Sequence, residues 1–434
     1  MSATEAGTEP GTGSTAGDTG AAAAASTAEP AAPTSTPPLT SIPNPDPAPK
    51  PSASPSPSSR RIRDVDALRG FALFGIVLVN VEIMTGPYSA GAGPSASMPD
   101  QVAAWLVTAL VSGKFYLLFA FLFGYSFTLQ ARAAERDGAG FAARHLRRVL
   151  CLFLLGLAHA VLLFPGDILM TYAVLGLVLF AVRNVTPRKL VRAAVWLVVA
   201  LSAVLLARGL AALGSAAAPA DAAGAADSVA AYRGDPMSVV HTNLEQWRLM
   251  LGGDFLYAPH ILAAFLLGLA AGKHRVLAEP HRYRGQMIRL LRYGLPLGLA
   301  GGAFAAVCGN GPLDPRWSDI GMAVEVLTAP ALTGAYVSAL VLVLGTRRGR
   351  RLGGVLAPAG RMALTNYLTQ SLVMALVFTG YGLALYGRAA TAAVLAGSCV
   401  LYVAQVAVSN WLMRQVRYGP VERLLHTVTR GRTG

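Results

Sequence analysis

Apolar segments long enough to cross a lipid bilayer recur along this chain from residue 65 onward. A spanning helix needs about 20 apolar residues, and it satisfies its own backbone hydrogen bonds, which lipid cannot do. Only 13% of the residues are charged, whereas a soluble protein carries roughly a quarter. The sequence therefore predicts an all-α, polytopic membrane protein, a bundle of about ten transmembrane helices. The predicted spans are residues 65–84, 104–130, 148–164, 167–183, 190–212, 256–272, 293–310, 320–345, 362–386 and 390–413, and the second can break at Gly113-Lys114.

The net charge of +14 is divided among short basic clusters between the apolar runs. If ten spans follow a cytoplasmic N-terminus, 29 of the 36 Lys and Arg residues lie in cytoplasmic segments and four lie in outer loops. Cytoplasmic loops of membrane proteins carry such an excess of Lys and Arg. The bias predicts that both termini are cytoplasmic and argues against a nucleic-acid partner.

Two segments lie outside the predicted spans. Residues 1–59 consist mainly of Ala, Pro, Ser, Thr and Gly, which predicts a disordered tail before a membrane domain at 60–434. The extracytoplasmic loop at about 213–255 contains an amphipathic stretch that either covers an outward-facing cavity or only connects two spans. The three cysteines and the histidines lack metal-ligand spacing, so no metal site is expected.

Residues 144–172 place polar groups at the two ends of one predicted span. Arg144, Arg147 and Arg148 precede an apolar run that contains His159, and Asp167 follows a Pro-Gly turn. Arg148 to His159 covers about 16 Å at ~1.5 Å per residue, against a hydrocarbon core of ~30 Å. A basic cluster at one membrane face and a His/Asp pair toward the other are therefore expected.

Each of these groups has a chemical and a structural interpretation. His159 can act as a general base that Asp167 orients, because imidazole titrates near neutral pH. Alternatively, His159 packs against a backbone carbonyl and Asp167 caps the next helix. The arginines bind the phosphates of an anionic cofactor or anchor the protein to anionic lipid.

Further ionisable or polar residues within the spans are candidate site residues, because such groups are costly in lipid unless they are paired. Asp66 and Arg69 share a helix face, either as a structural pair or with Asp66 holding Arg69 toward an anionic cofactor. Lys114 is expected to face a cavity or a carboxylate such as Glu82. Asn366 belongs to a polar stripe that either bonds across helices or lines a substrate tunnel.

The segment RIRDVDALRGFALFGIVLVN at 61–80 resembles the opening motif of the YeiB-like family of bacterial multi-pass membrane proteins, domain of unknown function 418. The likeness continues through FLFGYSF (121–127), the RR…GLAH…GDIL pattern (147–172), FLLGLAAGK (265–273), GRMALTNYLTQS (360–371) and YGPVE (418–422). The resemblance implies a bacterial plasma membrane location. This family is in turn similar to transmembrane acyltransferases, which move an acyl group from cytoplasmic acyl-CoA to an extracytoplasmic acceptor.

That similarity implies acyl-CoA or acetyl-CoA as donor, bound by Arg69 and the three arginines at 144–148, and a cell-envelope glycan, lipid or small molecule as acceptor. Asn80 stands where the O-acetylating branch has its catalytic histidine. Asparagine cannot act as a base, although it can donate a hydrogen bond to an oxyanion, so His159 with Asp167 is the predicted base. The predicted substrate and oxyanion positions are Asn80, Lys114, Tyr172 and Asn366. A further departure is His426, where similar chains usually carry arginine.

A proton-coupled transporter or flippase without acyltransferase activity is the alternative. His159, Asp167, Glu325 and Lys114 would then form a proton or ligand relay, and the arginine clusters would only set the topology. Transporters favour broken helices and internal repeats, and no repeat is evident. A scaffold without catalysis would instead tolerate alanine at the polar positions.

Overall fold

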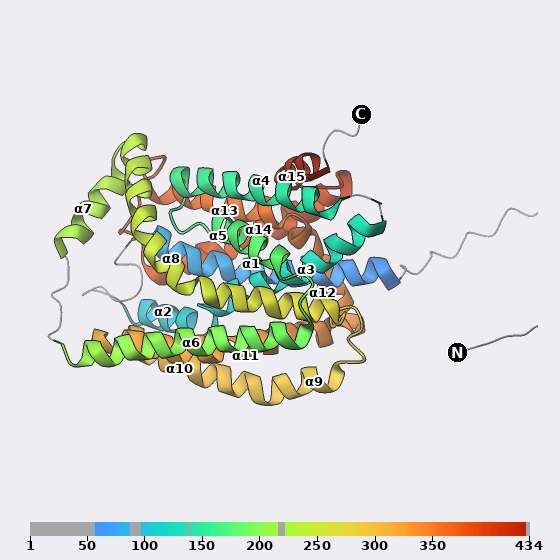
Figure 1. Cartoon of the computed structure of the whole chain (residues 1–434). Helices are drawn as coiled ribbons and strands as arrows, with labels where there is room; N and C mark the ends of the chain where they lie inside the picture. The colour runs from blue at the N-terminus through green and yellow to red at the C-terminus, as the bar shows by residue number, and fades with distance from the viewer. Residues whose placement is uncertain (1–56, 87–96, 137, 139, 216–221, 431–434) are drawn as a thin grey trace, which may run out of the picture. The chain divides into compact units, whose positions relative to one another are not determined.

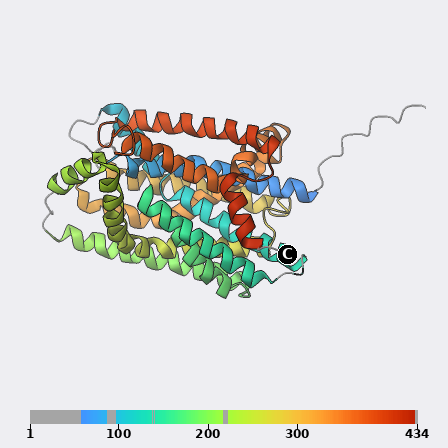
Figure 2. The same ribbon diagram turned by 90° about the horizontal axis from the view of Figure 1, so that it is seen from above.

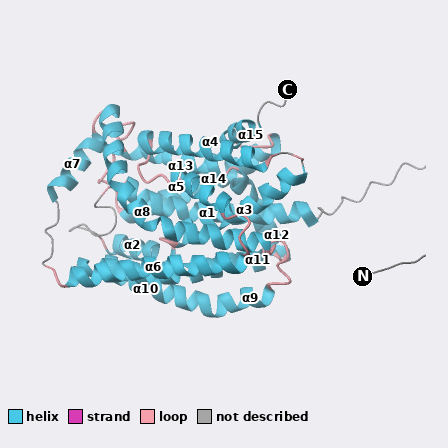
Figure 3. Cartoon of the chain, in the orientation of Figure 1, coloured by secondary structure: helices cyan, strands magenta, loops and turns pink. Residues whose placement is uncertain are grey.

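The computed structural model describes residues 57–86, 97–136, 138, 140–215 and 222–430. Nearly all of these residues are helical and none of them forms a strand (Figure 3). The helices are α1 (Pro57–Met84), α2 (Met98–Leu110), α3 (Lys114–Arg136), α4 (Phe141–Leu162), α5 (Leu169–Ala181), α6 (Pro187–Leu213), α7 (Ala222–Arg233), α8 (Pro236–Lys273), α9 (Arg284–Arg289), the π-helix η1 (Leu290–Gly294), α10 (Leu295–Asn310), the 3₁₀-helix η2 (Pro315–Trp317), α11 (Ser318–Leu344), α12 (Arg347–Arg361), α13 (Ala363–Phe378), α14 (Thr391–Gln415) and α15 (Pro420–Arg430).

The predicted all-α, multi-pass membrane architecture is confirmed. Within the described residues, eight helical stretches are long and apolar enough to cross a membrane, and α5 and α13 are shorter apolar helices. Each predicted span coincides with one of these ten. The span predicted at 362–386 was too long, because α13 ends at Phe378. The tail predicted at 1–59 lies outside the described residues except for its last three, which already belong to α1.

The apolar helices run side by side, roughly antiparallel, through one bundle (Figures 1 and 2). The start of α1, the arginine-rich α12 and α15 lie at one end, which we name the basic end (Figure 1). Helix α7 lies at the other, which we name the opposite end. The first and last described helices therefore share the basic end, as an even number of crossings requires.

Glycines bring helices α3 and α8 into close contact at the centre of the bundle. A Cβ on Gly124 would collide with the Phe265 carbonyl, and one on Gly268 would collide with the Phe121 carbonyl. Small residues at such crossings let backbones approach, which replaces the hydrophobic driving force that lipid does not supply. This contact fixes the aromatic side chains of α3 that line the cavities described below.

The second predicted span is broken, at the position that the sequence indicates. Helix α2 ends at Leu110 and α3 begins at Lys114, while Gly113 between them has φ +77°. That conformation suits glycine, and a Cβ there would also lie 2.5 Å from Glu325 Oε1. The break therefore needs glycine for two independent reasons.

Most of the described residues of the predicted loop at 213–255 are helical, and the amphipathic stretch foreseen there belongs to α8. Helix α8 begins at Pro236, where Asp235 accepts hydrogen bonds from the amides of Met237 and Ser238 at 2.8 and 3.0 Å. An aspartate followed by proline is a strong helix start. Helix α12 forms within a predicted connection and α15 within the segment after the last predicted span, because basic amphipathic helices fall below the hydropathy of a span.

Candidate functional site

His159 and Asp167 form a buried pair at the end of α4. Nδ1 of His159 lies 2.8 Å from Asp167 Oδ1, and the two side chains are 1% and 0% exposed. The other carboxylate oxygen accepts a hydrogen bond from the Met170 amide at 2.9 Å. Asp167 thus orients the histidine and also caps α5, as the two interpretations predicted for this carboxylate, while the role of His159 as a base stays a prediction. Gly156 permits this packing, because a Cβ there would lie 2.6 Å from Asp167 Oδ2.

The pair leaves one histidine nitrogen available for chemistry. An ionised carboxylate only accepts hydrogen bonds, so Nδ1 donates and a neutral imidazole keeps its lone pair on Nε2. Nε2 is buried and has no hydrogen-bond partner among the residues described. The geometry is that of a base whose tautomer is fixed by a carboxylate.

A cavity of about 420 Å³ opens on the basic-end side of this pair, and we name it the arginine cavity. Arg69, Arg144, Arg148 and Arg361 line it, together with Glu422. Its lining continues to Ile168, the residue after Asp167, and to Tyr367, whose ring centroid lies 5.0 Å from that of His159. The cavity therefore joins a cluster of cations to the immediate neighbours of the pair.

The arginines in this cavity have different partners. Arg69 donates to Asp66 Oδ1 at 2.8 Å and also to the Ser126 hydroxyl, which confirms the predicted Asp66–Arg69 pair. Nε of Arg148 is buried without a hydrogen bond in the described part of the chain, and its guanidinium carbon lies 5.9 Å from the centre of the Phe123 ring. A buried guanidinium nitrogen without an acceptor suits an anionic ligand.

Only two of the three predicted arginines of α4 line the cavity. Arg144 and Arg148, four residues apart, face the cavity, whereas Arg147 is exposed and is absent from its lining. Arg147 therefore fits the lipid-anchor interpretation. Tyr172 lines the cavity too, and its hydroxyl donates to the Tyr116 carbonyl at 3.0 Å.

A second space of about 510 Å³, the outer pocket, lies on the other side of the pair. Glu82, Phe164 and Asn243 line it. Phe164 also makes an edge-on ring contact with His159 at 6.0 Å. Asn243 is 1% exposed, donates to the Val161 carbonyl at 3.2 Å, and keeps a buried Oδ1 that has no partner among residues the structure describes. The His159–Asp167 pair thus lies between two cavities and is closed from them by Tyr367 and Phe164.

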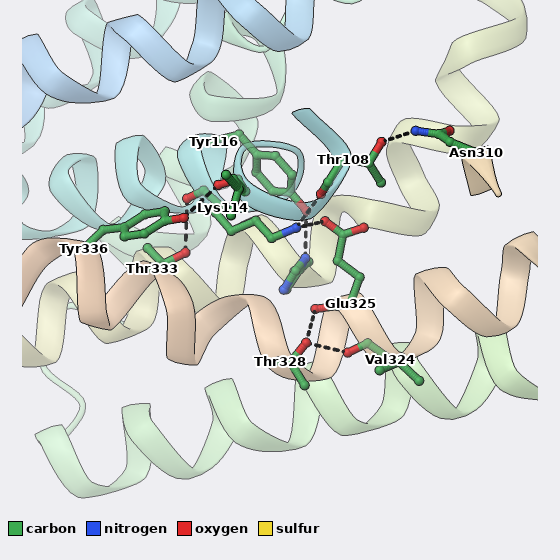
Figure 4. A network of polar contacts seen from close by, with 11 residues as sticks. Thr108, Lys114, Tyr116, Asn310, Val324, Glu325, Thr328, Thr333 and Tyr336 are labelled. Atoms are coloured by element: carbon green, nitrogen blue, oxygen red, sulfur yellow. Dashed lines mark hydrogen bonds and ion pairs between the residues drawn. The ribbon is translucent and has the colours of Figure 1, made fainter. Parts of the chain in front are cut away.

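Lys114 lies in a different polar network (Figure 4). Its ammonium lies 2.7 Å from Glu325 Oε1 and 2.9 Å from the Thr108 carbonyl. A carboxylate partner was predicted, but naming Glu82 as an example was wrong, because Glu82 lines the outer pocket. Lys114 lines neither the arginine cavity nor the outer pocket.

The two predicted asparagines also lie apart from these spaces. Nδ2 of Asn366 donates to the Ala359 carbonyl at 3.1 Å and to Ser409 Oγ at 3.0 Å, so it bonds α13 to α12 and α14. Asn80 is half-buried and lines neither space. Substrate contact by either residue stays a prediction.

Sequence reasoning missed several residues of the arginine cavity. Arg361, five residues before Asn366, and His145, three residues before Arg148, both line it and were not predicted as site residues. Glu422 of the YGPVE motif accepts hydrogen bonds from the Leu364 and Thr365 amides at 2.7 and 3.0 Å. The motif therefore fixes the start of α13, on which Tyr367 lies.

Comparison with known proteins gives a family without an assigned activity. A family model described as a protein of unknown function (DUF418) matches residues 271–432. The uncharacterised protein YxaH of Bacillus subtilis (strain 168) is 31% identical over 392 residues, which cover 86% of this chain and 95% of the relative. The uncharacterised protein YeiB of Escherichia coli (strain K12) is 26% identical over 394 residues, covering 84% and 95%.

Proposed function

Because the chain belongs to the DUF418 family of proteins of unknown function, we propose its activity from the geometry of the site. The proposal is acyl transfer from a cytoplasmic acyl-CoA to an extracytoplasmic acceptor. The observation that carries it is the buried His159–Asp167 pair, which lies between the arginine cavity and the outer pocket. Nε2 of His159 has no hydrogen bond within the described residues.

The arginine cavity is the proposed donor site. Four guanidinium groups line it, and planar guanidinium forks suit phosphate oxygens such as those of coenzyme A. Arg148 and His159 are separated by about 16 Å along α4. An extended donor whose phosphates meet Arg148 would direct its acyl end toward the histidine.

The proposed reaction moves one proton and one acyl group. Nε2 of His159 takes the proton from an acceptor hydroxyl or amine, whose oxygen or nitrogen attacks the thioester carbonyl. The carbon–sulfur bond breaks, the new carbon–oxygen or carbon–nitrogen bond remains, and the proton passes to the departing thiolate. Asp167 keeps Nδ1 protonated and stabilises the imidazolium. Because the pair lines neither cavity as described, substrates reach it only after Tyr367 and Phe164 move.

The donor site is tested by acetyl-CoA calorimetry on the full chain in detergent. Arg148→Ala is expected to abolish micromolar binding, whereas Arg147→Ala, the adjacent exposed arginine, retains it. Binding by wild type would justify following label from [¹⁴C]acetyl-CoA into cell-envelope fractions, which His159→Gln should stop. If folded wild-type protein binds neither acetyl-CoA nor longer acyl-CoAs, the proposal is wrong.

The Lys114–Glu325 pair favours a second candidate, a proton-coupled transporter. The pair lies within the membrane-spanning helices and beside the break between α2 and α3, and broken helices with ionisable groups are typical of transporters. Proteoliposomes under a proton gradient would test it, with substrate uptake or dye-reported proton flux as the readout. Loss of this flux in Glu325→Gln, together with normal flux in Arg148→Ala, would favour transport over acyl transfer.

A further inference from the structure

A third cavity, of about 790 Å³, lies against α8 and shares no lining residue with the arginine cavity, and we name it the α8 cavity. Helices α3, α6, α8, α9 and α11 enclose it, with η1 contributing Leu290. Nothing in the proposed acyl transfer uses this space. Its lining includes His260, Ala263, Ala264, Leu267, Ala270 and Ala271 of α8.

The α8 cavity is long in the direction of the bundle axis. Its lining extends from His260 to His274 at the C-cap of α8, fourteen residues apart, which corresponds to about 21 Å at ~1.5 Å per residue. Half of a ~30 Å hydrocarbon core is about 15 Å. Alanines on α8 and Gly334 on α11 leave the space open along this length. A hydrocarbon chain of one leaflet fits these dimensions.

Two of the polar side chains in the lining bond to α3. Thr333 Oγ1 donates to the Lys114 carbonyl at 3.1 Å, and His260 Nδ1 lies 2.7 Å from the Tyr116 hydroxyl (Figure 4 shows the threonine and the tyrosine). These bonds engage the Thr333 hydroxyl and one of the two ring nitrogens of His260. The remaining wall is mainly aliphatic, which favours an apolar chain over a polar solute.

The mouth of the cavity is cationic. Arg282, Tyr283 and Gln286 line it, and the Arg282 side chain is 70% exposed. Residues 273–292 contain six Lys or Arg residues and one acidic residue, Glu279. Arg275 approaches Glu279 to 3.4 Å, whereas Arg282 stays 3.9 Å away. Arg282 therefore keeps most of its hydrogen-bonding capacity for an anion at the mouth.

The backbone around this mouth is also unusual. Helix α8 ends in a Schellman motif, in which the Val276 amide bonds to the Ala271 carbonyl at 3.0 Å. Arg275 holds the left-handed position, with φ 57°, where glycine is the usual residue. Leu290 in the wall begins the π-helix η1, a local structure found often at functional sites. Uncommon backbone geometry thus gathers where the cations meet the cavity.

We propose that the α8 cavity binds one anionic membrane phospholipid, with an acyl chain along α8 and the headgroup phosphate at Arg282. Basic pockets between spanning helices near the cytoplasmic face suit such headgroups. The elongated apolar wall supplies the chain site, and Arg282 at the mouth supplies the selectivity for an anion. This site is independent of the arginine cavity and does not require acyl transfer.

The test is native mass spectrometry of the full-length protein in detergent, with phosphatidylglycerol and phosphatidylcholine of identical chains. Wild type is expected to retain one phosphatidylglycerol and to prefer it to phosphatidylcholine. Arg282→Glu should lower that affinity about tenfold or more, because it removes one cation and adds an anion at the mouth. Arg292→Glu makes the same charge change at an exposed residue outside the lining and should have little effect.

Two further measurements distinguish binding of the acyl chain in the cavity from binding of the headgroup phosphate at its mouth. Ala264→Phe fills the cavity and should reduce retention while an unchanged melting temperature shows that the protein is folded; if it unfolds, Gly334→Leu replaces it. Inorganic phosphate should fail to displace the lipid. Equal retention of both lipids, equal loss in Arg282→Glu and Arg292→Glu, or displacement by inorganic phosphate would overturn the proposal.

Discussion

Removing one partner of the Lys114–Glu325 pair should destabilise the protein more than removing both. The two side chains are 1% and 8% exposed, and their charged atoms are 2.7 Å apart. Glu325→Gln leaves a buried ammonium without its counter-charge, and breaking a buried pair in this way costs about 3–5 kcal/mol. The ammonium keeps the Thr108 carbonyl, at 2.9 Å, which places the expected cost near the lower value.

The double variant Lys114→Met/Glu325→Leu removes both charges and replaces them with side chains of similar volume. Replacing a whole buried pair by apolar residues is often neutral or stabilising. The Thr108 carbonyl then loses one donor, which costs about 1 kcal/mol. We therefore expect the double variant to be less destabilised than Glu325→Gln by about 2 kcal/mol or more.

Equilibrium unfolding in mixed micelles measures these differences, and the four species form a double-mutant cycle. The pair Arg275–Glu279, whose atoms are 3.4 Å apart and whose side chains are 49% and 29% exposed, is the control and should show a coupling of less than about 1 kcal/mol. If Glu325→Gln is as stable as wild type, or if the double variant is less stable than either single one, the reasoning about a buried charge is refuted.

The remaining predictions concern the packing and chemistry of the candidate site. Asp167→Asn should lower any acyl-transfer rate by about 10⁴, because an amide nitrogen facing Nδ1 selects the wrong imidazole tautomer; a rate within about tenfold of wild type would contradict this role. Gly156→Val should separate α4 from α5 and lower the melting temperature, whereas Gly354→Ala, which has open space, should not. Gly268→Leu should prevent the α3–α8 contact and reduce folded yield, and normal yield would argue against that crossing.

Local sequence signals predicted the spans but not every helix. Hydropathy locates each apolar run, and the Gly113-Lys114 pair marks the break between α2 and α3. Helices α12 and α15 were missed because their arginines lower the hydropathy while one face still packs on the bundle. Such helices depend on tertiary contacts that a search for spans does not detect.

Contacts near in sequence could be predicted, whereas distant ones could not. Asp66–Arg69 and His159–Asp167 lie within one helix or across one turn, so spacing alone brings them together. The partner of Lys114 is 211 residues away, and nothing in the helical periodicity chooses Glu325 over Glu82. Likewise, helical spacing shows that Arg147 and Arg148 point in different directions. Which of the two faces the cavity can be decided only once the position of the cavity is known.

The two buried polar centres are connected through the first turns of α3. Lys114 begins this helix and bonds to Glu325, and two residues later the Tyr116 carbonyl accepts from the Tyr172 hydroxyl. Tyr172 lines the arginine cavity close to the His159–Asp167 pair. A shift of α3 that accompanies loss of the Lys114–Glu325 bond would therefore displace an acceptor that holds the cavity wall. This arrangement gives the ion pair an effect on donor binding without contact to the donor, so loss of acyl-CoA affinity in Glu325→Gln would not by itself place Glu325 at the binding site.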